Sequence, residues 1–135
     1  MIQFLLHIIG YDIWFYFAHK LLHTRQLYFI HKPHHYYYEP KFLDFYKCYI
    51  LEVPVVSVGF CCPLLFIYYK IFLLNWFYTQ MLYAFIFINI RGLMEHDKRT
   101  VFIVGNHHLK HHLHLKCNYG EYWLDYLFGT LHDNS

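Results

Sequence analysis

The chain has 135 residues, which suits a single domain (1–135) and leaves no room for a second core. Hydrophobic residues make up 58% of the sequence and charged residues only 15%, which is too apolar for a typical soluble domain. The net charge of +2 is too small to indicate a protein that binds nucleic acid.

Three apolar segments predict an all-α fold, an integral-membrane helical bundle. The first, Met1–Ala18, belongs to a helix expected to continue to Thr24. The second and third, Cys48–Tyr69 and Ile71–Ile90, each approach the roughly 20 residues that a membrane-spanning helix needs. Together they predict a helical hairpin that turns at Tyr68–Lys70, so about three segments are expected in the membrane.

Prolines predict the shape of this hairpin, and cations predict its orientation in the membrane. Pro54 and Pro63 predict a kink or a break in its first arm. Of the eleven Lys and Arg residues, only Lys70 lies between the two long apolar segments. Short loops rich in Lys and Arg stay on the cytoplasmic side of a membrane. The histidine-rich stretches, which hold the other cations, are therefore expected to face the cytoplasm.

The first cluster of histidines lies at the end of the first helix. At 100° per residue, Asp12, Tyr16, His19 and His23 share an arc of about 60° on one helix face. His19 and His23 can therefore bind one metal ion. Asp12 and Tyr16 are expected behind them, as the hydrogen-bond partners that metal-bound histidines need.

The second cluster follows on a connector rich in tyrosine. It consists of His31, His34 and His35, with Pro33 between them. Proline fits the first turn of a helix and not its interior. His34 and His35 are therefore expected to open a short helix, with His31 just ahead of it.

The third cluster lies on a helix expected to begin near Asn106. On a helix, His108, His111 and His112 span about 100°, whereas His107, His111 and His114 span about 60° in a neighbouring direction. Spacing alone does not choose between the two sets.

The end of this helix and one more histidine complete the predicted elements. The helix is expected to stop at Asn118–Gly120, where Gly120 suits a left-handed cap. A short interfacial element with Trp123 and Phe128 should follow. His96 stands alone at the end of the third apolar segment. Neutral imidazole binds iron, zinc or copper, and eight or nine imidazoles brought together can hold two metal ions.

These motifs resemble the fatty acid hydroxylase/sterol desaturase superfamily of membrane di-iron oxidases over nearly the whole chain. The patterns that carry the resemblance are Asp12-x3-Tyr16-x2-His19-x3-His23, His31-x2-His34-His35, Glu52 with Pro54, Glu95–His96, His108-x2-His111-His112, Asn118–Tyr119–Gly120, Trp123, Asp125 and Phe128–Gly129–Thr130. The chain departs from the family pattern at Leu124, which separates Trp123 from Asp125.

The resemblance implies a metal site and favours His108 over His107. The implied cofactor is a pair of iron ions, with zinc as a substitute in purified protein. The implied ligands are His19, His23, His31, His34, His35, His96, His108, His111 and His112. Asp12, Tyr16, His107 and Asn118 are the candidates for hydrogen bonds to these ligands.

The resemblance also implies an activity. Family members hydroxylate or desaturate a lipid, a sterol or a fatty acyl chain, with O2 and with electrons from NAD(P)H through cytochrome b5 and its reductase. The expected location is the endoplasmic reticulum membrane, and no nucleic acid is expected as a partner. An alternative is a truncated, catalytically inactive membrane protein of the same family that only binds metal, because few residues precede His19.

Overall fold

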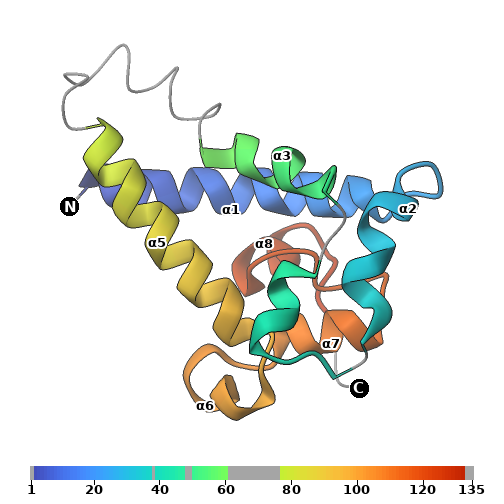
Figure 1. The fold of residues 1–135 in the computed structure, drawn as a ribbon. Helices are drawn as coiled ribbons and strands as arrows, with labels where there is room; N and C mark the ends of the chain where they lie inside the picture. Colours follow the sequence, from blue (N-terminus) through green and yellow to red (C-terminus); the bar gives the residue numbers. More distant parts are fainter. Residues whose placement is uncertain (1, 38, 48–49, 61–76, 133–135) are drawn as a thin grey trace.

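The structure is a computed structural model that describes residues 2–37, 39–47, 50–60 and 77–132 (Figure 1). All regular secondary structure in these ranges is helical, which confirms the predicted all-α class. The α-helices are α1 (Ile2–Leu22), α2 (Tyr28–His31), α3 (Glu52–Ser57), α5 (Phe77–Glu95), α6 (Val101–Val104), α7 (His107–Leu113) and α8 (Tyr122–Leu127). Short 3-10 helices are η1 (Lys32–Tyr36), η2 (Phe42–Tyr46), η3 (Val58–Phe60) and η5 (Lys98–Thr100).

Helix α1 is the element on which the others pack. Tyr11 of α1 and Ile88 of α5 are buried against each other, with Ile8 and Phe15 beside them. Figure 1 shows α5 starting at the N-terminal end of α1 and running away from it toward α6 and α7. The C-terminal end of α1 lies next to α2, and the end of α5 lies next to α7.

Helix α3 covers another side of α1. The Trp14 indole Nε1 donates a hydrogen bond to the Val55 carbonyl, at 2.8 Å. Pro54 lies in the first turn of α3, where a proline needs no backbone N–H partner. Helix α3 passes into the 3-10 helix η3 at Val58, whose backbone stays in the right-handed helical region, so the predicted kink or break in this arm stays a prediction. Pro63 and the predicted turn at Tyr68–Lys70 lie outside the described residues.

The predicted membrane segments receive less support. Within the part of the chain that the structure describes, no helix combines the length and the apolar character that a membrane span requires. Half of the second predicted segment, Cys48–Tyr69, lies outside that part.

The helix of the third histidine cluster ends earlier than predicted. It runs from His107 to Leu113, not to Asn118–Gly120. The left-handed residue is Asn118 (φ 55°), and it belongs to the following loop. Its side chain is used there to join chain segments, since Nδ2 donates to the His107 carbonyl and Oδ1 accepts from the His132 amide. The predicted short element after it is confirmed as α8.

Gly92 on α5 is a position where any side chain is expected to disturb the fold. An added Cβ would lie 2.5 Å from Cε2 of Phe45, well inside van der Waals contact. The Gly92 carbonyl also accepts a hydrogen bond from His96 Nδ1, at 2.7 Å. We expect Gly92→Ala to lower the free energy of unfolding by about 1–3 kcal/mol, as measured by denaturant titration. Unchanged stability would contradict this packing, because alanine has the higher helix propensity and would otherwise stabilise α5.

Candidate metal centre

Nine buried or half-buried histidines lie in two groups, and these are the nine that the sequence indicated. The first group is His19, His23, His31, His35 and His111, and the second is His34, His96, His108 and His112. Within each group, one ring nitrogen of every histidine lies within 4.8 Å of the others. Such spacing suits imidazoles that share one ion in each group.

Two of the sequence clusters are divided between these groups. The i,i+4 pair His108 and His112 points to the second group, whereas His111, on a neighbouring side of α7, points to the first. The second sequence cluster is divided in the same way. His31 and His35 belong to the first group, whereas His34 belongs to the second. The short helices η1 and α7 thus each contribute to both groups, whereas α1 and α2 contribute only to the first.

Backbone carbonyls fix the orientation of three of the rings. His19 Nδ1 donates to the Tyr119 carbonyl (2.5 Å), and His111 Nδ1 to the Cys117 carbonyl (2.6 Å). His96 Nδ1 donates to the Gly92 carbonyl within the end of α5 (2.7 Å). Because a carbonyl oxygen only accepts hydrogen bonds, each Nδ1 carries the proton and each Nε2 keeps a lone pair. This is the tautomer that a metal ligand needs.

A carboxylate orients a fourth ring. Glu52, on α3 and only 6% exposed, accepts a hydrogen bond from His31 Nδ1 at 2.7 Å. This hydrogen bond keeps the His31 proton on Nδ1 and leaves the lone pair of its Nε2 directed at the first group. The acidic position that the sequence resemblance indicated is therefore in contact with the first group.

The Nε2 atoms that face the centre of the first group carry too few protons to form hydrogen bonds with one another. Nε2 of His19 lies 2.8 Å from Nε2 of His31, although the Nδ1 atoms of both rings carry their protons. The inward atoms His23 Nε2 and His111 Nε2 are buried and have no hydrogen-bond partner among the described residues. Lone pairs at this distance repel each other unless a cation lies between them, so this donor set fits a metal ion.

Burial keeps these imidazoles neutral. It is the largest cause that lowers the pKa of all nine, and repulsion between neighbouring imidazoles adds to it in most of them. The pKa falls to about 4 for His23 and His96 and to about 3 for His112. Histidines with such pKa values bind metal at neutral pH without first losing a proton.

The free energy of unfolding of the metal-free protein is expected to fall as the pH drops below the ordinary histidine pKa. The folded pKa values are lowered, so below about pH 6.5 the unfolded chain binds more protons and stability falls as the pH falls. The loss continues down to the lowered pKa values, about 4 for His23 and His96. Circular dichroism of the metal-free protein across this range is the measurement, and a signal unchanged down to about pH 5 would contradict it.

Two predicted partners of the first cluster lie elsewhere. Asp12 forms an ion pair with Arg91 of α5 (2.5 Å), and the Tyr16 hydroxyl contacts Thr130 Oγ1 (2.9 Å). The prediction that they hydrogen-bond the histidines is wrong. The helix face was right, but Asp12 precedes His19 by seven residues, which is about 10 Å along the axis.

The structure distinguishes His108 from His107. The ring of His107 turns away from both groups, and its Nε2 donates to Asp125 Oδ2 at 3.0 Å. The Asn118 side chain bonds the backbone of His107 and of His132 and not an imidazole of either group. The prediction that His107 and Asn118 hydrogen-bond the metal ligands is therefore wrong.

Asp125, on α8, is the hydrogen-bond acceptor that holds the loop with two of the orienting carbonyls. It is fully buried and accepts hydrogen bonds from the amides of Tyr119 and Gly120 (2.9 Å each) and from Thr130 Oγ1 (2.6 Å). Burial alone would raise the pKa of Asp125, but the hydrogen bonds from His107 and from these groups hold it below the ordinary value. An ionised Asp125 thus fixes the backbone next to the carbonyls of Cys117 and Tyr119.

An apolar cavity of about 300 Å³ reaches both groups of histidines. Its walls come from α1, η2, α3 and α5. The residues that line it are Tyr11, Phe15, His31, His34, Phe45, Tyr46, Glu52, Val53, Val56, Ser57, Phe85, Ile88, Asn89, His96 and His108. A long apolar molecule in this cavity would therefore bring one of its carbons beside the imidazoles.

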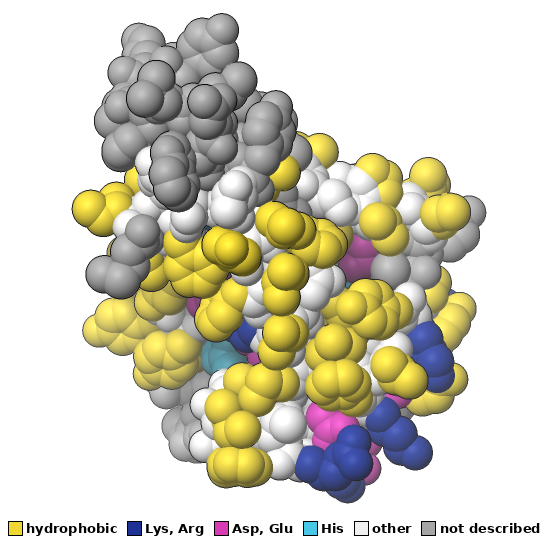
Figure 2. Space-filling view, turned by 60° about the vertical axis from the view of Figure 1, so that its left-hand side comes forward, with side chains coloured by type: hydrophobic (Ala, Val, Ile, Leu, Met, Phe, Trp, Pro, Cys, Tyr) yellow, Lys and Arg dark blue, Asp and Glu magenta, His cyan; other side chains and the backbone are white. Residues whose placement is uncertain are grey.

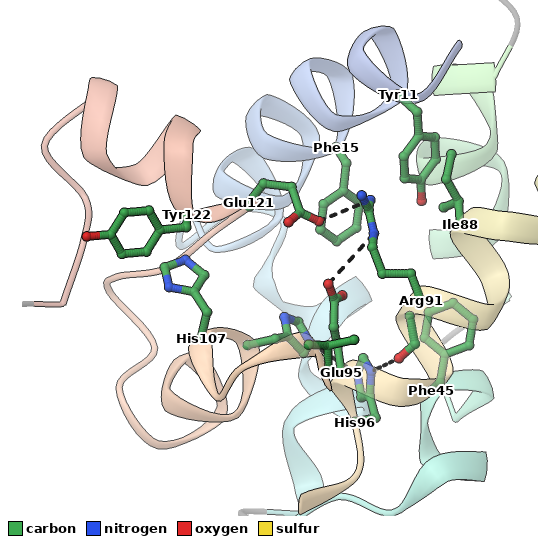
Figure 3. Close-up of a pocket in the computed structure, with 14 residues that line it drawn as sticks. Tyr11, Phe15, Phe45, Ile88, Arg91, Glu95, His96, His107, Glu121 and Tyr122 are labelled. Atoms are coloured by element: carbon green, nitrogen blue, oxygen red, sulfur yellow. Dashed lines mark hydrogen bonds and ion pairs between the residues drawn. The ribbon is translucent and has the colours of Figure 1, made fainter. Parts of the chain in front are cut away.

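A smaller cavity of about 100 Å³, here called the polar cavity because charged side chains form part of its wall, shares several lining residues with the first (Figure 3). His96 and His108 also line this cavity, together with Arg91, Glu95 and Glu121. Burial, and then the neighbouring carboxylate of Glu121, raise the pKa of Glu95 to about 8. Sequence reasoning missed this cluster, because Arg91 was interpreted only as a marker of membrane topology.

The surface of the protein is unusually apolar. Ile2, Leu5, Ile9, Ile13 and Phe17 form an exposed stripe at helical spacing along α1, and α5 exposes a similar set. Figure 2 shows hydrophobic side chains over much of one face, with a histidine visible in a hollow beside acidic and basic side chains. Exposed apolar patches of this extent mark surfaces that bind a membrane or another protein.

Comparison with known proteins gives one family and several relatives. A family model described as fatty acid hydroxylase matches residues 4–130. The Delta(7)-sterol 5(6)-desaturase of Gibberella zeae is 27% identical over 147 residues, which cover 96% of this chain and 41% of the relative. Methylsterol monooxygenase 1 is 29% identical in Rattus norvegicus and 28% in Danio rerio, over 88% of this chain and 43% of each relative. The chain thus spans about two fifths of these relatives. No solved structure matches it significantly.

Proposed function

Because the chain belongs to the fatty acid hydroxylase family, we propose that it is a membrane-bound, O2-dependent oxidoreductase that hydroxylates or desaturates a lipid. The observation that carries this proposal is the pair of imidazole groups at the end of an apolar cavity. Metal at these groups would supply the O2 chemistry, and the cavity would supply the substrate-binding site.

Two iron ions are the cofactors that we propose. His19, His23, His31, His35 and His111 would hold one ion, and His34, His96, His108 and His112 the other. The unsatisfied inward nitrogens and the protonated Nδ1 atoms behind them support this assignment. Zinc suits the same imidazole donors and would be a substitute in purified protein.

The residues of the apolar cavity would bind and orient the lipid. Phe45, Val53 and Ile88 offer apolar contact and exclude water, while His34, His96 and His108 stand at the point where the reacting carbon would lie. The names of the relatives favour a sterol over a fatty acyl chain. Whether the carbon is hydroxylated or desaturated would depend on its position relative to these histidines.

The proposed setting is the endoplasmic reticulum membrane, with the histidines on the cytoplasmic side. The exposed apolar stripe of α1 and the position of ten of the eleven cations outside the apolar hairpin support it. On that side, NAD(P)H would supply electrons through cytochrome b5 and its reductase, as the family resemblance implies.

The proposal is tested by supplying the purified, iron-loaded protein with reductant and a sterol mixture. We expect O2 uptake together with a product that is one oxygen atom heavier or two hydrogen atoms lighter than its substrate, detected by mass spectrometry. His111→Ala is the negative control. Iron binding without O2 uptake would overturn the enzymatic function in favour of a protein that only holds metal. A parallel reaction with fatty acyl lipids separates the two substrate classes.

A further inference from the structure

The polar cavity connects solvent with the four-histidine group. Glu95 and Glu121 have side chains that are 23% and 29% exposed, whereas His96 and His108 behind them are 3% and 9% exposed. Figure 3 shows both carboxylates pointing to the Arg91 guanidinium, Glu121 from the left and Glu95 from below, with His96 lower still. At about 100 Å³ the cavity exceeds the volume that one water molecule needs. A small hydrated ion therefore has a polar path from the surface to these imidazoles.

The charges along this path favour a cation. Arg91 is the shared ion-pair partner of three carboxylates, at 2.5 Å from Asp12, 3.0 Å from Glu121 and 3.7 Å from Glu95. With Glu95 largely protonated near neutral pH, the carboxylates of Asp12 and Glu121 outnumber the single guanidinium and leave negative potential in a confined space. Such a cleft raises the local concentration of cations and their rate of association.

The path ends at His96, whose Nε2 atom is free of its proton and can bind metal. His96 lines the cavity, and its Nδ1 proton is committed to the Gly92 carbonyl. Its Nε2 lone pair therefore faces the group, 2.8 Å from His34 Nε2 and 3.1 Å from His108 Nε2. The histidines of the other group do not line this cavity, so the path leads to the second group alone.

We propose that the polar cavity is the entrance through which a divalent metal ion reaches the four-histidine group, with Glu121 as the first carboxylate to bind it. The ion exchanges water for a Glu121 oxygen and then for the imidazole nitrogens. Arg91 stays in place during this exchange because Asp12, which is only 5% exposed, holds its other side. The inference rests on the proposed function only in that these histidines bind metal.

The test is the rate at which the metal-free protein takes up Co²⁺, followed in a stopped-flow instrument by the visible absorption of bound Co²⁺. Glu121→Gln keeps the size of the side chain and removes its charge. Its uptake is expected to slow about tenfold, with weaker dependence on ionic strength, since the charge acts by raising the association rate. The final amount of Co²⁺ bound is expected to equal that of the unchanged protein.

Glu39→Gln is the matched control. Glu39 is an exposed carboxylate that pairs with Lys98 outside the cavity, so its loss should leave the uptake rate unchanged. Unchanged uptake in Glu121→Gln, or equal slowing in both variants, would overturn the entrance. If the unchanged protein binds no Co²⁺, the proposed metal centre itself fails. Circular dichroism of each variant separates slow uptake from misfolding.

Discussion

Replacing His108 by alanine is expected to remove the metal ion from the four-histidine group and to abolish lipid oxidation, whereas replacing His107 is expected to do neither. The two histidines are adjacent on α7, yet only His108 has its Nε2 atom in the group. Loss of a hydrogen-bond partner behind a metal ligand costs about 10–100-fold in affinity or activity. Loss of the ligand itself should therefore cost more than about 100-fold.

His107→Ala is a stringent control because it also removes a stabilising hydrogen bond. It removes the hydrogen bond to Asp125 and should lower the free energy of unfolding by about 1–3 kcal/mol. Metal content by elemental analysis and O2 uptake are the measurements for both variants. If His107→Ala loses an equivalent of metal and His108→Ala keeps it, the assignment of the two residues is reversed.

Removing the carboxylate of Asp125 is expected to cause the largest loss of stability. Asp125→Ala leaves the Tyr119 and Gly120 amides, Thr130 Oγ1 and His107 Nε2 without their acceptor in a buried position. Removing one member of a buried charged network costs about 3–5 kcal/mol. Denaturant unfolding of the metal-free protein measures this loss, and Asp125→Asn, which retains one acceptor oxygen, should lose less.

The pH dependence of this loss has a definite sign. Hydrogen bonds hold the pKa of Asp125 below its ordinary value even though burial opposes them. The stabilisation is therefore complete above the ordinary aspartate pKa of about 3.9 and disappears only as the pH falls through the lower folded value. The difference between the unchanged protein and Asp125→Ala should be equal at neutral and mildly alkaline pH. A difference that shrinks between them would contradict an ionised Asp125.

The sequence was most informative where helix periodicity and ligand chemistry coincide. His19 near the end of α1 and His23 just after it point to the same group, and Pro33 places a short helix next to His31, as expected. The division of the later clusters between two groups was not predictable, because it depends on where η1 and α7 lie relative to α1. Helix periodicity describes directions around one axis and contains no information about a second helix.

The hydrogen bonds behind the rings were the least predictable part. The acceptors for His19, His96 and His111 are main-chain carbonyls, which any residue at those positions would provide. They leave no trace in the sequence. The role of Arg91 was missed for a different reason. A cation at the end of an apolar segment is equally compatible with a topology marker and with a buried ion-pair partner.

The division of α7 between the two groups links them thermodynamically. An ion bound by His108 and His112 fixes the rotation and height of α7, and the same rigid helix carries His111 into the other group. The first ion to bind therefore removes part of the ordering cost for the second, which is positive cooperativity. As metal is supplied, the protein should pass from empty to doubly loaded with few singly loaded molecules, and partial metal starvation should leave a mixture of the two extremes.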